Sequence, residues 1–209
     1  MSMEHVKSFL NGFENAEKAK LLEELTTALS DQGQVLCVTP EKVIPPLRVK
    51  KLFDDAIIPT KSHETDSGFD LYAYKVEKLY ENNEAVSLES YASPSISKEI
   101  YLLPGQRCLI NTGISATVGP GFEIQIRPRS GNALKKGITV LNTPGTIDEG
   151  YRGMIGVILQ NASDSQVTIN MGDRIAQMVV CPVVLSKIQV VEDLDVTERN
   201  DGGFGHTGN

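Results

Sequence analysis

From residue 47 onward, the chain consists of short extended apolar segments separated by glycine and proline turns. Turn signals such as Pro104-Gly105, Gly119-Pro120-Gly121 and Met171-Gly172-Asp173 recur at the spacing expected of strands. Such strands bury their apolar sides by packing sheet on sheet, so the pattern predicts an all-β sandwich or barrel. The expected strands are residues 47–52, 69–74, 99–103, 108–116, 122–127, 138–141, 154–159, 167–169 and 176–184.

The pattern divides the chain into three expected parts. Residues 1–45 form a short N-terminal helical extension and linker, because apolar side chains recur at helical spacing over residues 3–31 and prolines follow. Residues 46–197 form the β domain, with a polar surface insertion at about residues 75–98. Residues 198–209 form a glycine-rich C-terminal flap that is expected to be flexible by itself.

Composition excludes several classes of protein. The 209 residues carry a formal net charge of −7, which argues against nucleic acid or an anionic membrane as the partner. No apolar run approaches the roughly 20 residues that span a bilayer, and the N-terminus lacks a secretory signal pattern, so a cytoplasmic location is expected. The three cysteines are far apart and are expected to be reduced and mostly buried.

The run from Asn142 to Gly153 is the first candidate site. Pro144 and Gly145 force a turn, and Asp148 stands at the end of the short extended segment that follows. Tyr151 comes three residues later, so a carboxylate, an aromatic ring and backbone amides are crowded into one hairpin. An ordinary surface hairpin with Asp148 as a turn residue is the structural alternative.

Three further segments place polar groups among apolar strands. Asp70 interrupts an apolar strand and needs a charged or hydrogen-bonding partner, which an ion pair or a ligand site would supply equally well. After Arg127 and Pro128, Ser130 is expected to cap a short helix beside Arg129, which suits an anion site or a plain helix cap. Gln177 falls among apolar residues and must be hydrogen-bonded.

The tail from Asp201 to Asn209 is the fifth segment. A single phenylalanine, Phe204, is framed by glycines and followed by Thr207. Such a tail is either disordered or a flap that stacks on a planar ring and donates to phosphates. Donors for a small polyanion are available in Arg127, Arg129, Arg174 and Arg199.

Taken in this order, the five segments resemble the trimeric deoxyuridine triphosphatase (dUTPase) family over about residues 47–209. The resemblance implies a β-barrel-like jelly roll that assembles as a homotrimer with shared active sites. It also implies that the chain is an enzyme that hydrolyses dUTP to dUMP and pyrophosphate, which limits uracil in DNA and supplies dUMP.

The resemblance further implies a role for each motif residue. Asp148 matches the base that activates the water attacking the α-phosphorus, and Tyr151 matches the ring that excludes a 2′-hydroxyl. Asp70 matches an aspartate that supports the site and its metal from a distance. Mg²⁺ is the implied cofactor, bound mainly by substrate phosphates and water. The remaining substrate-binding positions are Asn142, Gly145, Thr146 and Ile147 for uracil, Arg129, Ser130, Gly131 and Gln177 for phosphates, and Arg199, Phe204, Gly205, His206 and Thr207 in the flap.

Two other functions stay open at this point. The related dCTP deaminases share the fold and a Thr-Ile-Asp turn, but they carry a glutamate after the aromatic residue, where this chain has Arg152. A nucleotide-sensing interaction protein would use residues 1–45 or 75–98 to dock an unidentified protein partner.

Overall fold

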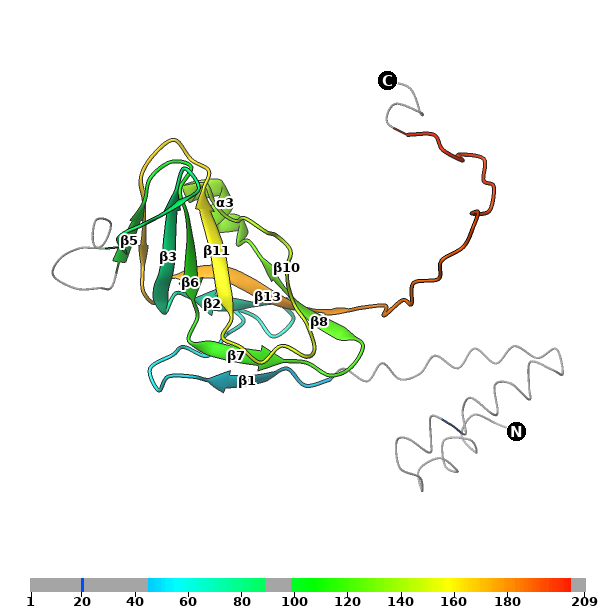
Figure 1. Cartoon of the computed structure of the whole chain (residues 1–209). Coiled ribbons are helices and arrows are strands. Elements are labelled where there is room, and N and C mark those ends of the chain that lie inside the picture. Colours follow the sequence, from blue (N-terminus) through cyan, green and yellow to red (C-terminus); the bar gives the residue numbers. More distant parts are fainter. Residues whose placement is uncertain (1–19, 21–44, 89–98, 204–209) are drawn as a thin grey trace. The chain divides into compact units, whose positions relative to one another are not determined.

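The structure is a computed structural model that describes Lys20 and residues 45–88 and 99–203. The chain divides at residue 44, and the second unit, from Pro45 onward, contains the β domain (Figure 1). The expected N-terminal helices, the expected linker up to residue 44 and the end of the flap from Phe204 lie outside the described residues. No described helix is long and apolar enough to cross a membrane.

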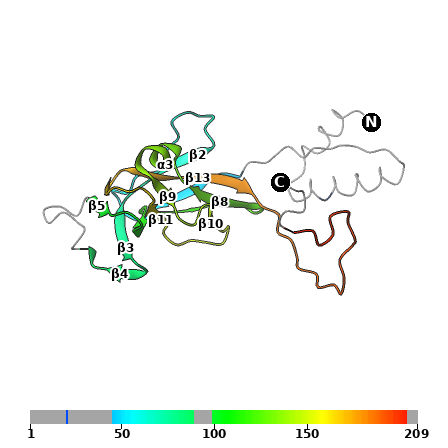
Figure 2. The same cartoon turned by 90° about the horizontal axis from the view of Figure 1, so that it is seen from above.

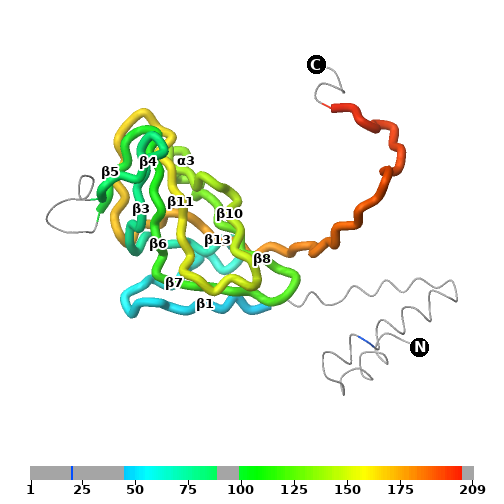
Figure 3. The backbone as a smooth tube through the Cα atoms, viewed as in Figure 1, coloured from blue at the N-terminus to red at the C-terminus, as the bar shows by residue number. Residues whose placement is uncertain are grey.

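The described part of the domain is almost entirely strands joined by turns, which confirms the all-β prediction. The path of the chain can be followed in Figure 3. The elements are β1 (Arg48–Lys51), β2 (Gly68–Tyr72), β3 (Lys75–Glu81), β4 (Glu84–Val86), β5 (Glu99–Leu102), β6 (Arg107–Asn111), β7 (Ile114–Thr117), β8 (Phe122–Arg127), α3 (Ser130–Lys136), β9 (Ile138–Val140), β10 (Gly145–Ile147), β11 (Gly156–Asn161), β12 (Val167–Asn170) and β13 (Arg174–Pro182).

Two larger sheets position the candidate site. One has the strand order β10-β8-β13-β2 and the other β4-β3-β6-β11-β9, and two short pairs, β1-β7 and β12-β5, complete the described sheets (Figures 1 and 2). Strands distant in the sequence are neighbours, as where β13 lies between β8 and β2. Alternate residues of both large sheets form one apolar core, which includes Leu71, Ile126 and Met178 from the first and Leu79, Ile110 and Leu159 from the second.

The structure corrects three expectations from the sequence. The predicted insertion at residues 75–98 begins as the hairpin of β3 and β4, because Asn82 and Asn83 both adopt positive φ, 47° and 67°, and close a tight turn. Leu79 is buried at 1% exposure, so this polar stretch still contributes to the core. The single strand predicted for residues 108–116 is two strands, since Gly113 breaks it at a φ of 73°.

The third correction concerns the short helix α3. Ser130 is its first helical residue and Arg129 is the N-cap, with no side-chain cap hydrogen bond, so the predicted capping role of Ser130 is wrong. The helix ends at Gly137, whose φ of 64° provides the left-handed C-cap. Of the cysteines, Cys108 is a buried free thiol whose pKa burial raises to about 12, and Cys181 is a half-buried free thiol.

Candidate active site

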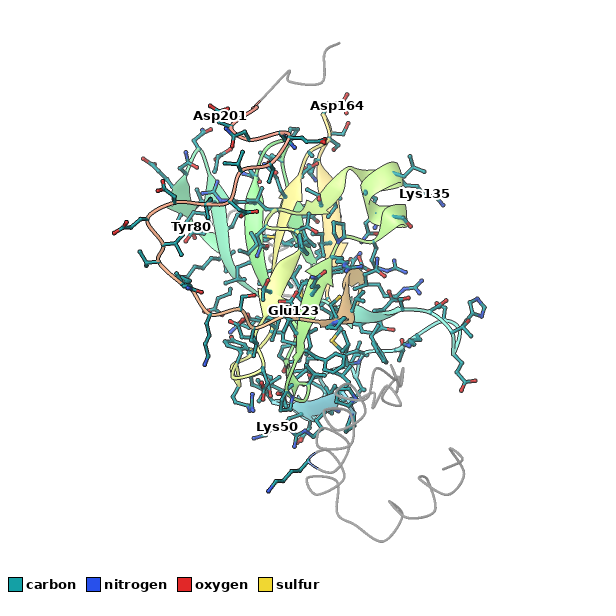
Figure 4. All side chains as sticks on the ribbon, turned by 90° about the vertical axis from the view of Figure 1, so that its right-hand side faces the viewer. Lys50, Tyr80, Glu123, Lys135, Asp164 and Asp201 are labelled. Carbon is teal, nitrogen blue, oxygen red and sulfur yellow. The ribbon has the colours of Figure 1, made fainter. Side chains whose placement is uncertain are left out.

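Polar side chains on β2, β8 and β13 lie together on the outer face of the β10-β8-β13-β2 sheet. Gln177 is the cross-strand partner of both Asp70 on β2 and Arg127 on β8, so these three side chains share one face. The adjacent residues Ile126 and Met178 point the other way into the core. Side chains of β8 and its neighbours are drawn in Figure 4, where Glu123 is labelled.

Asp70 is the centre of a charged cluster on this face. Its Oδ1 accepts a hydrogen bond from Arg129 Nε at 2.7 Å, and its Oδ2 accepts one from Arg174 Nη1 at 3.1 Å. The Asp70 side chain is only 13% exposed, so pairing offsets the desolvation of its charge. This confirms that Asp70 needs a charged partner, and the two arginines together leave the cluster with a net positive charge.

Gln177 joins the end of β8 to this cluster. Its Nε2 donates a hydrogen bond to Pro128 O at 2.9 Å, which confirms that this half-buried amide is hydrogen-bonded. A Cβ on Gly68 would collide with Gln177 Oε1, so the glycine on β2 leaves space for that side chain. The amide thereby fixes the backbone from which Arg129 and Ser130 project.

A pocket of about 290 Å³, called the anion pocket below, opens beside this cluster. Arg129 keeps N–H donors beyond the two bonded to Asp70, and Ser130 and Gly131 start α3 at the pocket wall. A positive cluster beside backbone amides and a hydroxyl suits the binding of an anion. Its lining residues are Ser62, Asp66, Ser67, Gly68, Asp70, Arg129, Ser130, Gly131 and Gln177.

The Asn142–Gly153 hairpin contributes to a second, smaller pocket, called the hairpin pocket below. Gly145 is buried on β10, and a Cβ there would lie 3.1 Å from Asn142 Nδ2, so backbone and amide pack closely. The Thr143–Pro144 peptide bond in this turn is cis. The pocket has a volume of about 40 Å³ and is lined by Ile126, Val140, Asn142, Gly145, Thr146, Ile147, Gly156, Val157 and Ile158.

Asp148 and Tyr151 follow β10 in a tight turn. Asp148 is exposed, and its carbonyl accepts a hydrogen bond from Tyr151 N at 3.0 Å. The Tyr151 hydroxyl donates to Met154 O at 2.9 Å, so the half-exposed ring is tied down at both ends. Thr117 on β7 donates to Glu149 O at 3.1 Å and fixes the turn to the body of the domain. Asp148 and Tyr151 therefore share one turn that is anchored to the domain.

The structure keeps the two pockets apart within one chain. They share no lining residue, and Ile126 of the hairpin pocket lies on the opposite sheet face from Gln177 of the anion pocket. In the described part of the tail, Arg199 is exposed and donates to Gly202 O.

Two arginines differ from what the sequence predicts. Arg127 is one of the four candidate anion donors, but its guanidinium binds Gln125 Oε1 at 2.6 Å and contacts Cys181. Arg174 is also such a candidate, with no motif role assigned to it, yet it binds Asp70. Its position at the start of β13, 104 residues after Asp70 in the sequence, gives no local signal of that contact. The sequence prediction also misses Ser62, Asp66 and Ser67 of the pocket wall, since they precede β2 in an irregular polar stretch.

The residues described in the structure contain no cluster of three or more histidine, cysteine or acidic side chains that could hold a metal by themselves. Near the anion pocket, Asp66 and Asp70 are the acidic residues of the lining. A cation here would therefore need oxygen ligands from a bound anion and from water.

Comparison with known proteins identifies the family. The deoxyuridine 5′-triphosphate nucleotidohydrolase of Crocosphaera subtropica is 49% identical over 162 residues, which is 78% of this chain and 98% of that protein. The dUTPase of Staphylococcus bacteriophage 80alpha, solved with dUPNHPP, has a TM-score of 0.61 at 24% identity and covers 78% of this chain and 99% of its own.

A second phage structure, a mutant form of the dUTPase from phage phi11 of S. aureus, was solved with a structural Mg(II) ion. It has a TM-score of 0.56 at 21% identity and covers 72% of this chain and 99% of its own. At these identities the two phage structures establish the fold alone. The sequence profile of the dUTPase family matches residues 94–208. With this match and the close bacterial relative, the chain belongs to the dUTPase family.

Proposed function

We propose that this chain is a dUTP diphosphatase, which hydrolyses dUTP to dUMP and pyrophosphate by attack of water on the α-phosphorus. The observation that carries the proposal is the hairpin, on which an exposed carboxylate, Asp148, stands three residues from the anchored ring of Tyr151. The activity of relatives such as the Crocosphaera subtropica nucleotidohydrolase supports the same reaction. No observation favours deamination or nucleotide sensing instead.

Asp148 is the proposed general base. It orients a water molecule and accepts its proton as the oxygen attacks the α-phosphorus, and the pyrophosphate leaves with the bonding electron pair of the broken P–O bond. Asp148 is exposed, so a water molecule can reach its carboxylate. Its fixed turn keeps the base in one position, which positional catalysis requires.

The anion pocket is the proposed phosphate site. Arg129, Ser130 and Gly131 bind the phosphate chain, and Gln177 holds their backbone and supplies its remaining amide hydrogen. Asp70 holds Arg129 in the orientation that leaves its free N–H groups for phosphate. The positive cluster stabilises the negative charge that grows on the leaving pyrophosphate.

The hairpin pocket is the proposed nucleoside site. Asn142 and the backbone of Gly145, Thr146 and Ile147 read the edge of uracil, and Tyr151 lies under the deoxyribose, where it leaves no room for a 2′-hydroxyl. The flap residues Arg199, Phe204, Gly205, His206 and Thr207 close over the bound nucleotide.

Mg²⁺ is the proposed cofactor. When bound, it neutralises phosphate charge and orients the triphosphate chain. The residues fit a metal held mainly by phosphates and water, because the pocket wall offers the carboxylates of Asp66 and Asp70 but no set of three ligands among the described residues. Asp70 would act on the metal indirectly, since both of its oxygens already accept hydrogen bonds from arginines.

A homotrimer with shared active sites is the proposed assembly. The hairpin pocket and the anion pocket share no lining residue in one chain, and in this assembly a second copy supplies the other half of the site. The described tail supports this, because Ile188 and Val190 are 96% and 92% exposed in the single chain and would be covered by a neighbour. Residues 46–197 form the β domain of each subunit and residues 198–209 the flap, while residues 1–45 form the N-terminal extension.

Release of pyrophosphate from dUTP, with dCTP and UTP at equal concentration as controls, tests the proposal. We expect rapid release from dUTP and little from the other two nucleotides. Ammonia release from dCTP would instead indicate a deaminase. Binding of dUTP with no turnover in the presence of Mg²⁺ would indicate a nucleotide sensor.

A further inference from the structure

We propose that Gly153 is a specificity-determining positioning residue, which holds the Tyr151 ring in the place where it excludes a 2′-hydroxyl. The inference deepens the proposed function and rests on the role given there to Tyr151. Gly153 touches neither the nucleotide nor the water in this proposal. It acts through the space that it leaves for the tyrosine ring.

The space beside Gly153 is filled by Tyr151. A Cβ added at residue 153 would lie 2.5 Å from the Tyr151 hydroxyl oxygen, 2.7 Å from Cζ and 3.1 Å from Cε2. Contacts below 3.0 Å are essentially absent from real Cβ environments, so the ring and a side chain at residue 153 exclude each other. The φ of Gly153 is outside the left-handed region, so its backbone conformation is open to other residues and clearance is the reason for glycine.

The ring has little freedom to yield to a larger residue. Its hydroxyl donates to Met154 O at 2.9 Å, and its backbone N donates to Asp148 O at 3.0 Å. A ring that swings away from residue 153 loses the hydrogen bond to Met154 O. Arg152 Nη1 also donates to Tyr151 O at 2.8 Å and holds the intervening residue.

The backbone near Gly153 is also held in place and cannot shift away from the Tyr151 ring. Ile155 is 0% exposed in the core, and its N donates to Ile114 O at 2.9 Å. Ile155 O accepts hydrogen bonds from both the backbone N and the side chain of Thr112, at 3.0 and 2.8 Å. The chain two residues after Gly153 is thus fixed to the β domain, and a new side chain must displace the ring.

Rigidity is what makes a ring selective. A ring that excludes a hydroxyl by contact discriminates only by the free energy needed to move it aside. Because the Tyr151 side chain is 42% exposed, packing alone does not hold it, and its position depends on the two hydrogen bonds and the fit over Gly153. The physical prediction is that loss of this fit weakens sugar discrimination more than it weakens the chemical step.

The same hairpin offers a matched control. Gly150 also flanks Tyr151 and also lacks a positive φ, but a Cβ there would meet nothing within 4 Å. Gly150→Ala and Gly153→Ala therefore add the same methyl group on either side of one tyrosine. They differ in whether that methyl group meets the ring.

The test is the ratio of kcat/KM for dUTP to kcat/KM for UTP in the full chain. Gly153→Ala should lower this ratio about tenfold, with KM for dUTP raised more than kcat is lowered. Gly150→Ala should keep the ratio of the unaltered protein. An unchanged ratio in folded Gly153→Ala, or an equal fall in both variants, overturns the proposal.

A double-mutant cycle separates positioning of the ring from general damage to the hairpin. The shortest contact is with the tyrosine hydroxyl, so Gly153→Ala should lower the ratio less in a Tyr151→Phe background than in the unaltered protein. Fully additive losses contradict a contact between the two positions. If Gly153→Ala does not fold, Tyr151→Phe decides by itself, since a reduced ratio supports the anchored ring and an unchanged ratio overturns it.

Failure of the proposed function gives a different result. An unaltered chain that releases no pyrophosphate from dUTP refutes the proposed reaction before any variant is made. An unaltered chain that prefers dUTP over UTP, together with a Gly153→Ala variant that keeps this preference, refutes only the role of Gly153.

Discussion

At the scale of single residues, three arginines near the end of β8 and the start of β13 differ in the side chains that they contact. Arg129 and Arg174 share the Asp70 carboxylate, at 2.7 Å and 3.1 Å, and form the positive cluster at the anion pocket. Arg127 instead extends a row of polar side chains toward Gln125 and Cys181. Charge near a site is thus not enough to assign a role, because the side-chain contacts decide which donors remain for a ligand.

Replacement of Asp148 by asparagine should abolish turnover. The amide keeps the shape of the carboxylate but cannot accept the proton of water, and a general base typically contributes on the order of 10²–10⁴ in rate. Pyrophosphate release measures the loss, and calorimetric binding of a non-hydrolysable dUTP analogue serves as the control for an intact site. Near-normal turnover of Asp148→Asn would remove this residue from the mechanism.

Replacement of Asp70 by asparagine should weaken the phosphate site. Two arginines lose their shared counter-charge and Arg129 loses its fixed orientation, so KM for dUTP should rise about tenfold, which corresponds to about 1.4 kcal/mol. Asp164→Asn is the control, since Asp164 is exposed in the turn between β11 and β12 and does not line that pocket (Figure 4). Equal KM values for the two variants would argue against Asp70 as the residue that orients Arg129.

At the scale of elements, the hairpin and the tail contrast in how they are held. The hairpin is pinned by backbone pairing of β10 with β8 and by the bond from Thr117 to Glu149 O. The described tail beyond β13 is exposed along almost its whole length, as Leu185 and Val196 show at 76% and 87%. A general base benefits from a fixed element such as the hairpin. Closure over a ligand instead requires an element that can move, such as the exposed tail.

Removal of residues 198–209 should lower activity without unfolding the β domain. The described residues of this segment contribute nothing to the buried core, so the midpoint of thermal unfolding should stay within a few degrees of the full chain. Turnover at low dUTP should fall about a hundredfold or more, because the proposed role of the flap is to exclude water and to complete the phosphate contacts. Full activity of the truncated chain at low dUTP would contradict a flap.

At the scale of the whole molecule, the proposed site is shared between copies. The two pockets share no lining residue within one chain, and in the proposed trimer a nucleotide that uses both is bound by neighbouring subunits. Catalysis in the proposed trimer depends on assembly, so dilution below the dissociation range of the oligomer should reduce activity as well as size.

Mixed oligomers test this division directly. Chains that carry Asp148→Asn and chains that lack residues 198–209 should each have little turnover alone at low dUTP, and co-refolded mixtures should recover a fraction of the turnover of the unaltered protein. Recovery is expected because some sites then combine an intact base from one chain with an intact flap from another. Size-exclusion chromatography with light scattering should show a trimer in every sample. Absence of any recovery in verified mixed trimers would place base and flap on the same chain.

The sequence by itself determined the features that depend on local physics. Alternating apolar segments and glycine–proline turns gave the all-β class, and the strand from Phe122 to Arg127 has the predicted bounds. The need of Asp70 and Gln177 for polar partners followed from their position among apolar neighbours, because an unpaired polar group in a core is costly. The placement of Asp148 after a short strand followed from Pro144 and Gly145.

Only the tertiary structure decided which groups meet. The partners of Asp70 lie 59 and 104 residues away, and strand order brings them together. The β3–β4 hairpin escaped prediction because its buried residues are few and its surface is polar. The clearance of Gly153 for the Tyr151 ring and the separation of the two pockets depend on side-chain directions in three dimensions. Turn propensity and the alternation of apolar and polar residues act between near neighbours in the chain. The contacts of a site instead join residues whose proximity is set by the packing of the whole domain.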